Sequence, residues 1–424
     1  MKIQSKLPSL QEYSRDARLL LSVSCLTAIS FYGIQMLLRS LYLLRLGFDT
    51  AYVGSYLATG ALAYMSMGIP SGALGSRFGT RSVMRIGGLI SLVGMIMLPV
   101  VEIAPSQFRA SVPHLAQLVQ IGGWSMVNVN LVPALMGATS ITNRNNSYAL
   151  ASGLREFGSF LGSLVGGLLP AFFSLLGGQN LDQPGPYRSG LWVGIVLWIV
   201  AQVPLFFIHS GQTLPRKKRV SGQGAFPFLQ IAVLFLYVYI RHASWATCQS
   251  FCNPYMDQEL RYSTATIGTI TALGQILAIA ASLFVPRLLK KHSTGWLLIG
   301  ATLGVGLSEF ILASSTLLPL ITIGRLGVLV SMAIWLPTLQ VYQMETVSES
   351  WRGLAYGSLS MAMGLGFASM GYGGGYVIDT LGYSSIFKVG AALSVLAAVM
   401  MFGILRQNNK VAERTHQMQT LTLE

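Results

Sequence analysis

The chain has 424 residues, of which 52% are hydrophobic and only 10% are charged. An average soluble domain is about 25% charged, so a soluble chain of this composition could not cover its surface with polar groups. The composition excludes a disordered chain, a secreted disulfide scaffold and most soluble enzymes, and indicates a protein that crosses a membrane many times. The formal net charge of +14 then reflects basic loops on one side of the membrane rather than binding to nucleic acid.

Twelve apolar segments are long enough to be spanning helices, which need about 20 mostly apolar residues each. The first is too long for a signal peptide and lacks a cleavage site, so we expect it to be retained. In chain order the predicted spans are 18–43, 51–75, 82–101, 113–139, 148–176, 189–209, 226–253, 264–289, 294–315, 318–343, 352–378 and 383–405. The sequence therefore predicts an all-α integral membrane protein.

A long polar stretch at 209–224 divides these spans into six and six. We predict an N-terminal six-helix bundle at 1–210, a cytoplasmic linker at 211–225, and a C-terminal six-helix bundle with a short cytoplasmic tail at 226–424. Basic residues gather in the loops on the linker side, and fewer lie on the other side, where they are Arg45, Arg109, Arg188, Arg261 and Lys388. This bias predicts that both termini are cytoplasmic, in a plasma membrane of the bacterial inner-membrane type.

Two stretches of the first half recur in the second half. Residues 49–60 align with 263–274 at a shift of 214, and 123–167 align with 327–371 at a shift of 204. The identical pairs include Gly54 with Gly268, Gly167 with Gly371, and Pro133 with Pro337. Two matches with similar shifts predict that the halves are parallel repeats, related by an axis along the membrane normal.

The loop after the second span combines glycines with arginines. It reads GALGSRFGTR from Gly72 to Arg81 and resembles the signature G-x-L-a-D-r-x-G-r-R of the major facilitator superfamily (MFS). The resemblance implies a gating role for Gly72, Ser76, Arg77, Gly79 and Arg81. Ser76 stands where the family has aspartate, so the charge relay attributed to this loop is not expected to carry over.

Two other spans bear on the resemblance. Residues 158–167, GSFLGSLVGG, are similar to the GxxxGPxxGG motif of the family's antiporters, with Ser163 in place of proline. Small residues also let helices approach closely, so packing is the alternative explanation. Residues 117–126 lack the arginine that the family's drug exporters often carry there, so coupling schemes built on that arginine do not transfer. The resemblance implies an MFS fold whose first, fourth, seventh and tenth spans line a central cavity.

Ionisable side chains within spans are costly in lipid and are expected to face a cavity or a partner. They are Arg39, Arg155, Glu156, Arg241, His242, Glu309 and Arg325. Arg39, Arg241 and Arg325 fall on spans that line the cavity by resemblance, although Arg39 and Arg325 could instead extend to the interface. Glu309 is expected to form a structural pair or to lie at the interface.

Glu156 and His242 are the candidates for proton coupling, because a buried carboxyl group and an imidazole can exchange protons near neutral pH. Neighbouring residues on a helix point about 100° apart, so Arg155 and Glu156 are not expected simply to pair with each other. The alternatives are an interhelical ion pair for Glu156 and a neutral, hydrogen-bonded His242.

Polar and aromatic side chains recur at helical spacing on the first and seventh spans, which places them on one face of each helix. Aromatic walls with a few polar groups suit a small organic ligand, and arginines favour a carboxylate or phosphate on it. The predicted substrate-binding residues are Tyr32, Gln35, Arg39, Trp124, Asn128, Arg241, Trp245, Gln249, Asn253 and Arg325.

The sequence as a whole favours a secondary active transporter of a small organic solute, anionic or amphipathic, that works by alternating access and is coupled to protons. The alternatives are an efflux antiporter for lipophilic compounds and a non-transporting sensor of the same fold. Motifs of hydrolases, metalloproteases and P-loop enzymes are absent from the sequence, so no enzyme activity is expected. We expect a monomer in the lipid bilayer, with no cofactor, metal or nucleic acid. Cys25, Cys248 and Cys252 are expected to be packing residues.

Overall fold

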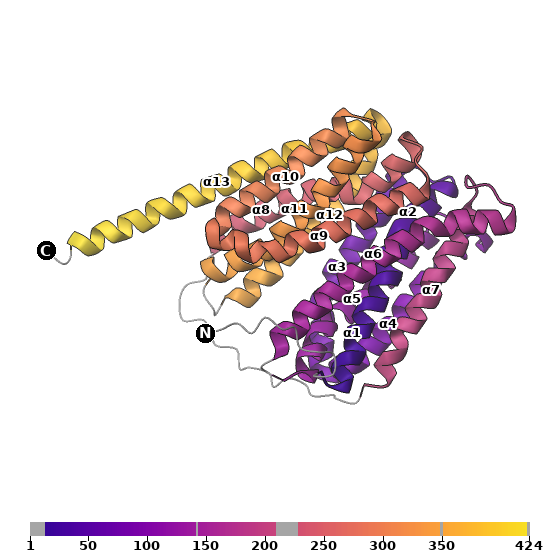
Figure 1. The fold of residues 1–424 in the computed structure, drawn as a ribbon, viewed down its shortest axis with the longest axis horizontal. Helices are drawn as coiled ribbons and strands as arrows, with labels where there is room; N and C mark the ends of the chain where they lie inside the picture. Colours follow the sequence, from indigo (N-terminus) through magenta and orange to yellow (C-terminus); the bar gives the residue numbers. More distant parts are fainter. Residues whose placement is uncertain (1–12, 141–142, 209–227, 348–350, 422–424) are drawn as a thin grey trace. The chain divides into compact units, whose positions relative to one another are not determined.

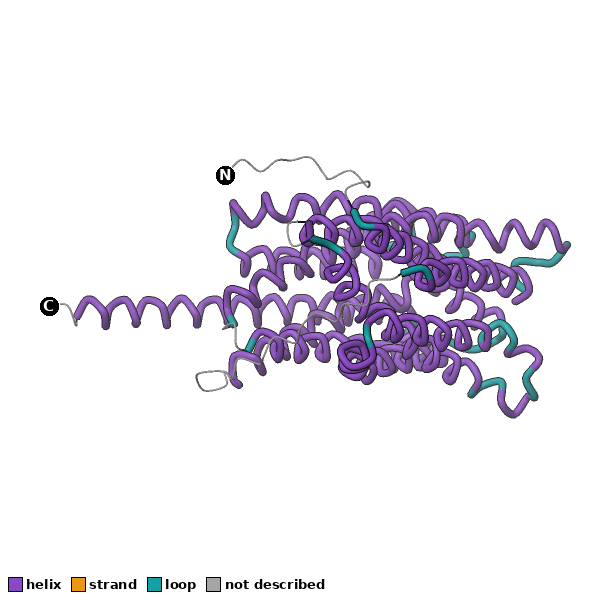
Figure 2. Tube along the Cα trace, turned by 90° about the horizontal axis from the view of Figure 1, so that it is seen from below, coloured by secondary structure: helices purple, strands orange, loops and turns teal. Residues whose placement is uncertain are grey.

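The computed structural model describes residues 13–140, 143–208, 228–347 and 351–421, and its regular elements in these ranges are helices (Figures 1 and 2). The first span is continuous through α1 (Arg15–Thr27), η2 (Ala28–Gln35) and α2 (Met36–Arg45). It is followed by α3 (Thr50–Phe78), α4 (Thr80–Met97), the short η3 (Val101–Ile103) and η4 (Ser106–Phe108), α5 (Val112–Ala138), α6 (Arg144–Gly177) and α7 (Pro184–Phe206). The second half has α8 (Phe228–Pro254), η6 (Tyr255–Glu259), α9 (Thr264–Lys291), α10 (Thr294–Ser314), α11 (Leu318–Thr346), α12 (Arg352–Leu381) and α13 (Tyr383–Leu421).

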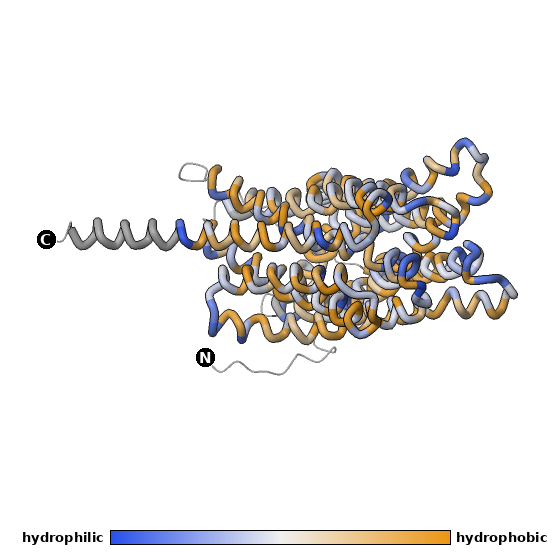
Figure 3. Tube along the Cα trace, turned by 90° about the horizontal axis from the view of Figure 1, so that it is seen from above, coloured by the Kyte–Doolittle hydropathy of each residue, from blue (hydrophilic) through white to orange (hydrophobic). Residues whose placement is uncertain are grey.

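These helices confirm the predicted all-α fold of twelve long helical segments. Ten of the segments within the described ranges are long and apolar enough to cross a membrane; α3 and α12 have similar lengths but are not among the ten. Figure 3 shows hydrophobic residues along most of the helical length and hydrophilic residues concentrated near the turns. The predicted linker at 211–225 lies outside the described residues.

Local sequence signals set several helix ends. The side chain of Ser14 accepts a hydrogen bond from the Ala17 amide at 3.1 Å at the start of α1. Asp49 does the same for the Tyr52 amide at 2.7 Å at the start of α3. Such caps satisfy amide groups that have no partner inside the helix. Gly79, with a φ of +86°, makes the turn between α3 and α4, as the glycine-rich loop predicts.

Two of the spans contain a segment of π-helix, η2 in the first span and η6 at the end of the seventh. A π-helix bonds each amide to the carbonyl five residues earlier, so it rotates the residues that follow relative to a regular α-helix. Because of η2, the i, i+3, i+7 rule no longer places the side chains of the first span on one face.

The chain forms two compact units. The first comprises residues 1–219, 250–276 and 371–380, and the second comprises 220–249, 277–370 and 381–424. Segments of α8, α9 and α12 therefore pack with the first half of the chain. The boundaries of the two units differ from those of the predicted bundles. The division into bundles at 1–210 and 226–424 therefore stays a prediction.

Repeat-related glycines make two equivalent helix crossings in the first unit. A Cβ on Gly268 of α9 would lie 2.7 Å from the Gly167 Cα of α6, and a Cβ on Gly371 of α12 would lie 3.0 Å from the Gly54 carbonyl oxygen of α3. The repeat pairs Gly54 with Gly268 and Gly167 with Gly371. Each crossing thus joins a glycine of one repeat-related pair to a glycine of the other pair. This arrangement is expected of parallel repeats.

The glycine-rich motif of the fifth span packs α6 against the first span. Gly162 faces Gly33 of η2 so closely that a Cβ on Gly162 would lie 2.9 Å from the Gly33 Cα and would overlap the Ile29 carbonyl. This contact supports the packing explanation of the motif. Gly153 of the same helix is exposed, and a Cβ there would meet no other atom within 4 Å.

We expect Gly162→Ala to lower the free energy of unfolding by about 1–3 kcal/mol, because the added methyl group must push η2 and α6 apart. Gly153→Ala is the matched control: it gains helix propensity without a clash, so its stability should be unchanged or slightly higher. Thermal unfolding of both variants in detergent measures the difference. Equal stability of the two variants would contradict the close crossing.

Candidate functional site

The first unit holds an aromatic cluster built from the first, second and fourth spans. Trp124 of α5 stacks on Phe31 with ring centroids 4.7 Å apart, and meets Tyr32 edge-on at 5.7 Å. Tyr64 of α3 lies 5.1 Å from the Trp124 ring, and its hydroxyl accepts a hydrogen bond from Asn128 at 3.3 Å. The structure therefore brings three predicted ligand residues, Tyr32, Trp124 and Asn128, into one cluster.

The predicted stripe on the first span is divided by the π-helical segment. Gln35 is buried and donates to the Leu191 carbonyl of α7 at 3.1 Å. Arg39 is 3% exposed and donates to Gln117 of α5 at 2.9 Å. The expectation that Tyr32, Gln35 and Arg39 share a face is therefore wrong. Gln35 packs two helices together, and Arg39 is held inside rather than extended to the interface.

The signature loop supports the end of α7 rather than a charge relay. Ser76 donates to the Ala73 carbonyl within its own helix at 2.8 Å. Arg81 and Arg85 donate to carbonyls at the end of α7, at 3.4 Å to Phe206 and at 3.0 Å to Leu205. Cations at a helix C-terminus satisfy carbonyls that have no helical partner and match the helix dipole. In this loop, Arg77 lies over the ring of its neighbour Phe78 at 5.2 Å.

Arg155 and Glu156 form an ion pair of 3.6 Å, although they are adjacent in sequence. Each side chain is 41% exposed. The expectation that they do not simply pair is wrong, because both side chains are long and unconfined enough to bend toward each other across the helix surface. An ion pair this exposed contributes little to stability.

Arg241 of α8 is fully buried in the second unit. Its guanidinium lies 4.2 Å above the ring of Trp335, and its Nη1 donates to the sulfur of Met332 at 3.3 Å. Its Nε and Nη2 are enclosed and have no hydrogen-bond partner in the described part of the chain. Leaving two guanidinium donors unpaired in a buried site is costly unless an acceptor binds them.

Other predicted ligand residues follow Arg241 along α8. The ring of His242 lies 4.8 Å from that of Trp245 and 6.3 Å from that of Trp335. His242 Nδ1, Trp245 Nε1 and Gln249 Oε1 are enclosed without a hydrogen-bond partner among the residues described. Asn253, further along the same helix, is buried in the first unit.

Arg325 and Glu309 are both more deeply buried than the sequence predicts. Arg325 is 2% exposed and donates to the carbonyl and the sulfur of Cys248, both at 3.3 Å, so it does not extend to the interface. Glu309 is 0% exposed, so an interfacial position is wrong. Hydroxyl groups of Thr247 and Ser244 donate to its carboxylate at 2.5 and 3.2 Å.

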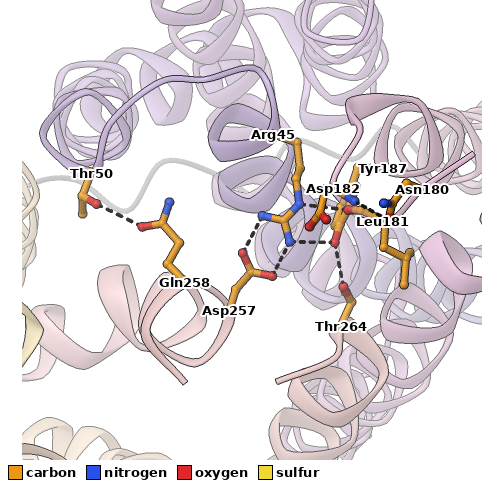
Figure 4. A network of polar contacts seen from close by, with 9 residues as sticks. All are labelled: Arg45, Thr50, Asn180, Leu181, Asp182, Tyr187, Asp257, Gln258 and Thr264. Carbon is orange, nitrogen blue, oxygen red and sulfur yellow. Dashed lines mark hydrogen bonds and ion pairs between the residues drawn. The ribbon is translucent and has the colours of Figure 1, made fainter. Parts of the chain in front are cut away.

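A polar network in the first unit joins the end of the first span to the end of the seventh (Figure 4). Arg45 donates through both Nη atoms to the two oxygens of Asp257 at 2.7 Å, and through Nε to the Leu181 carbonyl at 3.0 Å. Arg45 Nη2 also donates to the Tyr187 hydroxyl at 3.2 Å, and that hydroxyl lies 3.1 Å from the Thr264 hydroxyl. We call these residues the Arg45 network.

The Arg45 network is not predicted from the sequence, because the predicted first span ends at residue 43 and the predicted seventh span ends at residue 253. The π-helical segment η6 continues that span to Glu259 and carries Asp257. A signal was present: Arg45 and Asp257 are opposite charges at corresponding ends of the first and seventh spans, which the repeat relates.

Buried arginines, an enclosed carboxylate and aromatic clusters inside apolar helices define a polytopic membrane protein with polar sites in its interior. A family model described as the Major Facilitator Superfamily matches residues 234–421. The match lies within the second half of the chain, which is therefore similar to this superfamily.

Solved structures share the fold over almost the whole chain. A variant of the nucleoside transporter NupG is 15% identical, with a TM-score of 0.77, and covers 91% of this chain and 99% of its own. The xylose transporter XylE from E. coli is 15% identical, with a TM-score of 0.69, over 90% of this chain and 94% of its own. The human organic anion transporter MFSD10 is 15% identical, with a TM-score of 0.62, over 91% and 99%. These identities show a shared fold alone.

Among curated proteins, "Multidrug resistance protein 2" of Bacillus subtilis (strain 168) is 28% identical over 171 residues. The match covers 40% of this chain and 42% of the relative. The chain thus matches about two fifths of the length of this relative.

We expect Asp257→Asn to destabilise the Arg45 network by about 2 kcal/mol. Removing one partner of a buried ion pair costs about 3–5 kcal/mol, and Arg45 is 17% exposed, which weakens the pair. Glu102→Gln is the comparison, because the Arg188–Glu102 pair at 2.9 Å is more exposed, at 39% and 27%, and should cost less than about 1 kcal/mol. A double-mutant cycle on Arg45 and Asp257, read by thermal unfolding, measures the coupling; additive effects would contradict it.

Proposed function

We propose that this protein is a secondary active transporter of small amphipathic organic anions, and that it works by alternating access coupled to protons. The observation that carries the proposal is the unpaired edge of Arg241. Nε and Nη2 form one side of the guanidinium group, and both lack an acceptor within the described ranges. This side presents two parallel N–H groups, the arrangement that binds a carboxylate or phosphate through both of its oxygens.

The surroundings of Arg241 favour an organic anion over an inorganic one. Trp335 covers one face of the guanidinium, and Trp245 lies 6.0 Å from the ring of Phe367. Aromatic walls bury the apolar part of a ligand, and a few polar atoms then fix its orientation. His242 Nδ1 and Trp245 Nε1 are the neighbouring polar atoms without a partner in the described chain. Because the Arg241 edge is enclosed, a ligand reaches it only when neighbouring side chains move, as alternating access requires.

The Arg45 network supplies the contact that such a movement would break. It links the ends of the first and seventh spans, and Thr50 adds a hydrogen bond of 3.4 Å to Gln258 beside it. We infer that this is the outer end of the protein, because the basic loops predict that the opposite end and both termini are cytoplasmic. On this proposal the protein lies in a bacterial-type inner membrane, works as a monomer, and closes its outer side through Arg45 and Asp257.

Efflux of lipophilic compounds is a second candidate function. The name of the B. subtilis relative favours it, and so does the aromatic cluster around Trp124, which offers stacking surfaces with few charges. An efflux protein of this kind would bind lipophilic cations or neutral compounds, and its affinity for them would not depend on Arg241.

A thermal-shift screen of the purified protein against anionic, cationic and neutral organic compounds tests the proposal. We expect hits among aromatic carboxylates or phosphates, with about 2.7 kcal/mol of added stability at 100 times the Kd. Arg241→Lys should weaken binding at least tenfold, because lysine cannot offer two parallel donors.

Arg287→Lys is the matched control for Arg241→Lys. Arg287 also lies over an aromatic ring, that of Phe284 at 5.2 Å, but it is exposed, so its replacement should leave binding unchanged. Hits confined to lipophilic cations, with full affinity in Arg241→Lys, would favour the efflux function and remove Arg241 from the binding site.

A further inference from the structure

Glu309 of α10 lies in a cage of hydroxyl groups between α8 and α13. Thr247 and Ser244, one turn apart on α8, donate to its two carboxylate oxygens. The hydroxyl of Ser244 lies 2.6 Å from that of Ser394 on α13, which extends the cage to a third helix. Each of these four side chains is 0% exposed. A carboxyl group at the centre of three helices is therefore removed from water and held by neutral hydrogen-bonding groups.

The backbone of α13 leaves room for this carboxyl group. Gly390 faces it, and a Cβ at that position would overlap the Glu309 carboxylate and lie 2.5 Å from the Thr247 hydroxyl oxygen. Any side chain at residue 390 would thus displace the carboxyl group or its hydroxyl partner. The three helices are shaped around an acid at position 309, in contrast to Glu156, whose side chain is 41% exposed and paired with its neighbour.

The titratable groups that act on Glu309 lie on α8. Arg241 and Cys248 of α8 are close enough to act on the carboxylate electrostatically, but no nitrogen of a basic residue within the described ranges lies within ion-pair distance of it. Arg325 of α11 is bonded to Cys248. From α13, the groups against the carboxylate are Gly390 and Ser394, which do not titrate, and Lys388 on that helix is exposed.

Ionised carboxylates are costly in such surroundings, because two hydroxyl bonds do not replace a water shell or a paired cation. Uptake of one proton from water removes the charge, and the resulting acid O–H can donate to a hydroxyl oxygen of the cage. The reverse step returns the proton to water. No other bond is made or broken, so the cage is suited to binding and releasing a single proton.

We propose that Glu309 is the proton-binding residue of this protein, and that its protonation frees Arg241 to bind an anionic ligand. Proton binding by Glu309 is inferred from the cage alone, whereas the release of Arg241 for an anionic ligand rests on the proposed function. Arg241 is a basic residue that acts on the Glu309 carboxylate, so the ionised carboxylate and an anionic ligand compete for it. Protonated Glu309 ends that competition, and by linkage a bound anion favours protonation of Glu309. Anion and proton therefore bind together.

Infrared difference spectroscopy of the purified protein between high and low pH tests the cage directly, without any ligand. We expect the carbonyl band of a protonated carboxylic acid to appear in the wild-type protein and to be lost in Glu309→Gln. Glu345→Gln is the matched control, since Glu345 also accepts a hydrogen bond from a threonine, Thr294 at 2.7 Å, but at an exposed position. It should keep the band.

Two further variants keep this test decisive. Thr247→Val removes one donor to the carboxylate without changing its shape, so it should shift the band even if Glu309→Gln does not fold. Glu156→Gln shows whether the band comes from Glu156 instead of Glu309, and we expect this variant to keep the band. Persistence of the band in Glu309→Gln, its loss in Glu156→Gln, or the same band in Thr247→Val would each overturn the assignment to Glu309.

The coupling to Arg241 is tested by the affinity for benzenesulfonate, a probe whose own charge does not change with pH. In the wild-type protein we expect the affinity to rise roughly tenfold as the infrared band appears on acidification. In Glu309→Gln, which mimics the protonated acid, the affinity should be high and independent of pH. A pH dependence that survives in Glu309→Gln would overturn the coupling. Failure of the probe to bind at any pH would count against the proposed anion site, while the infrared result would still decide the role of Glu309.

Discussion

Hydrocarbon offers no hydrogen bonds, and this constraint decides where the chain places each polar group of its spans. Several of these groups find a partner on a neighbouring helix: Arg39 on Gln117, Gln35 on a carbonyl of α7, and Arg325 on Cys248. Arg241 keeps two enclosed donors without an acceptor among the described residues. Because both donors lie on one edge of a buried guanidinium group, and His242 Nδ1 and Trp245 Nε1 on the same helix are also enclosed without a partner among the described residues, this edge is the strongest indication of a ligand site.

Close packing of glycines makes the pairing of these polar groups possible. Backbones that cross at Gly54 and Gly371, and at Gly167 and Gly268, bring the second-half segments near Arg45 into the first unit. Because the two crossings involve repeat-related positions, the same local chemistry acts twice. The bidentate contact between Arg45 and Asp257 adds a charged interaction between the ends of the first and seventh spans. A conformational change can make or break this contact as a unit.

The candidate site and the candidate proton cage share the helix α8. Arg241 lies one turn before Ser244, and Ser244 lies one turn before Thr247. The helix therefore carries the cation on one part of its surface and the cage of Glu309 on an adjacent part. A charge change at either position alters the energy of the other, because electrostatic interactions are stronger inside a protein than in water.

The helical membrane fold, the repeats and an arginine inside the seventh span could be predicted from the sequence, because apolar length and residue spacing are local properties of the chain. The sequence also placed Trp124, Asn128, Arg241 and Trp245 among the ligand candidates. The neighbour that each polar group meets could not be predicted in this way, because it depends on how separate helices pack. The π-helical segments turned Gln35 away from Tyr32 and brought Asp257 to Arg45, and three separate helices enclosed Glu309, an outcome that no single-helix pattern contains.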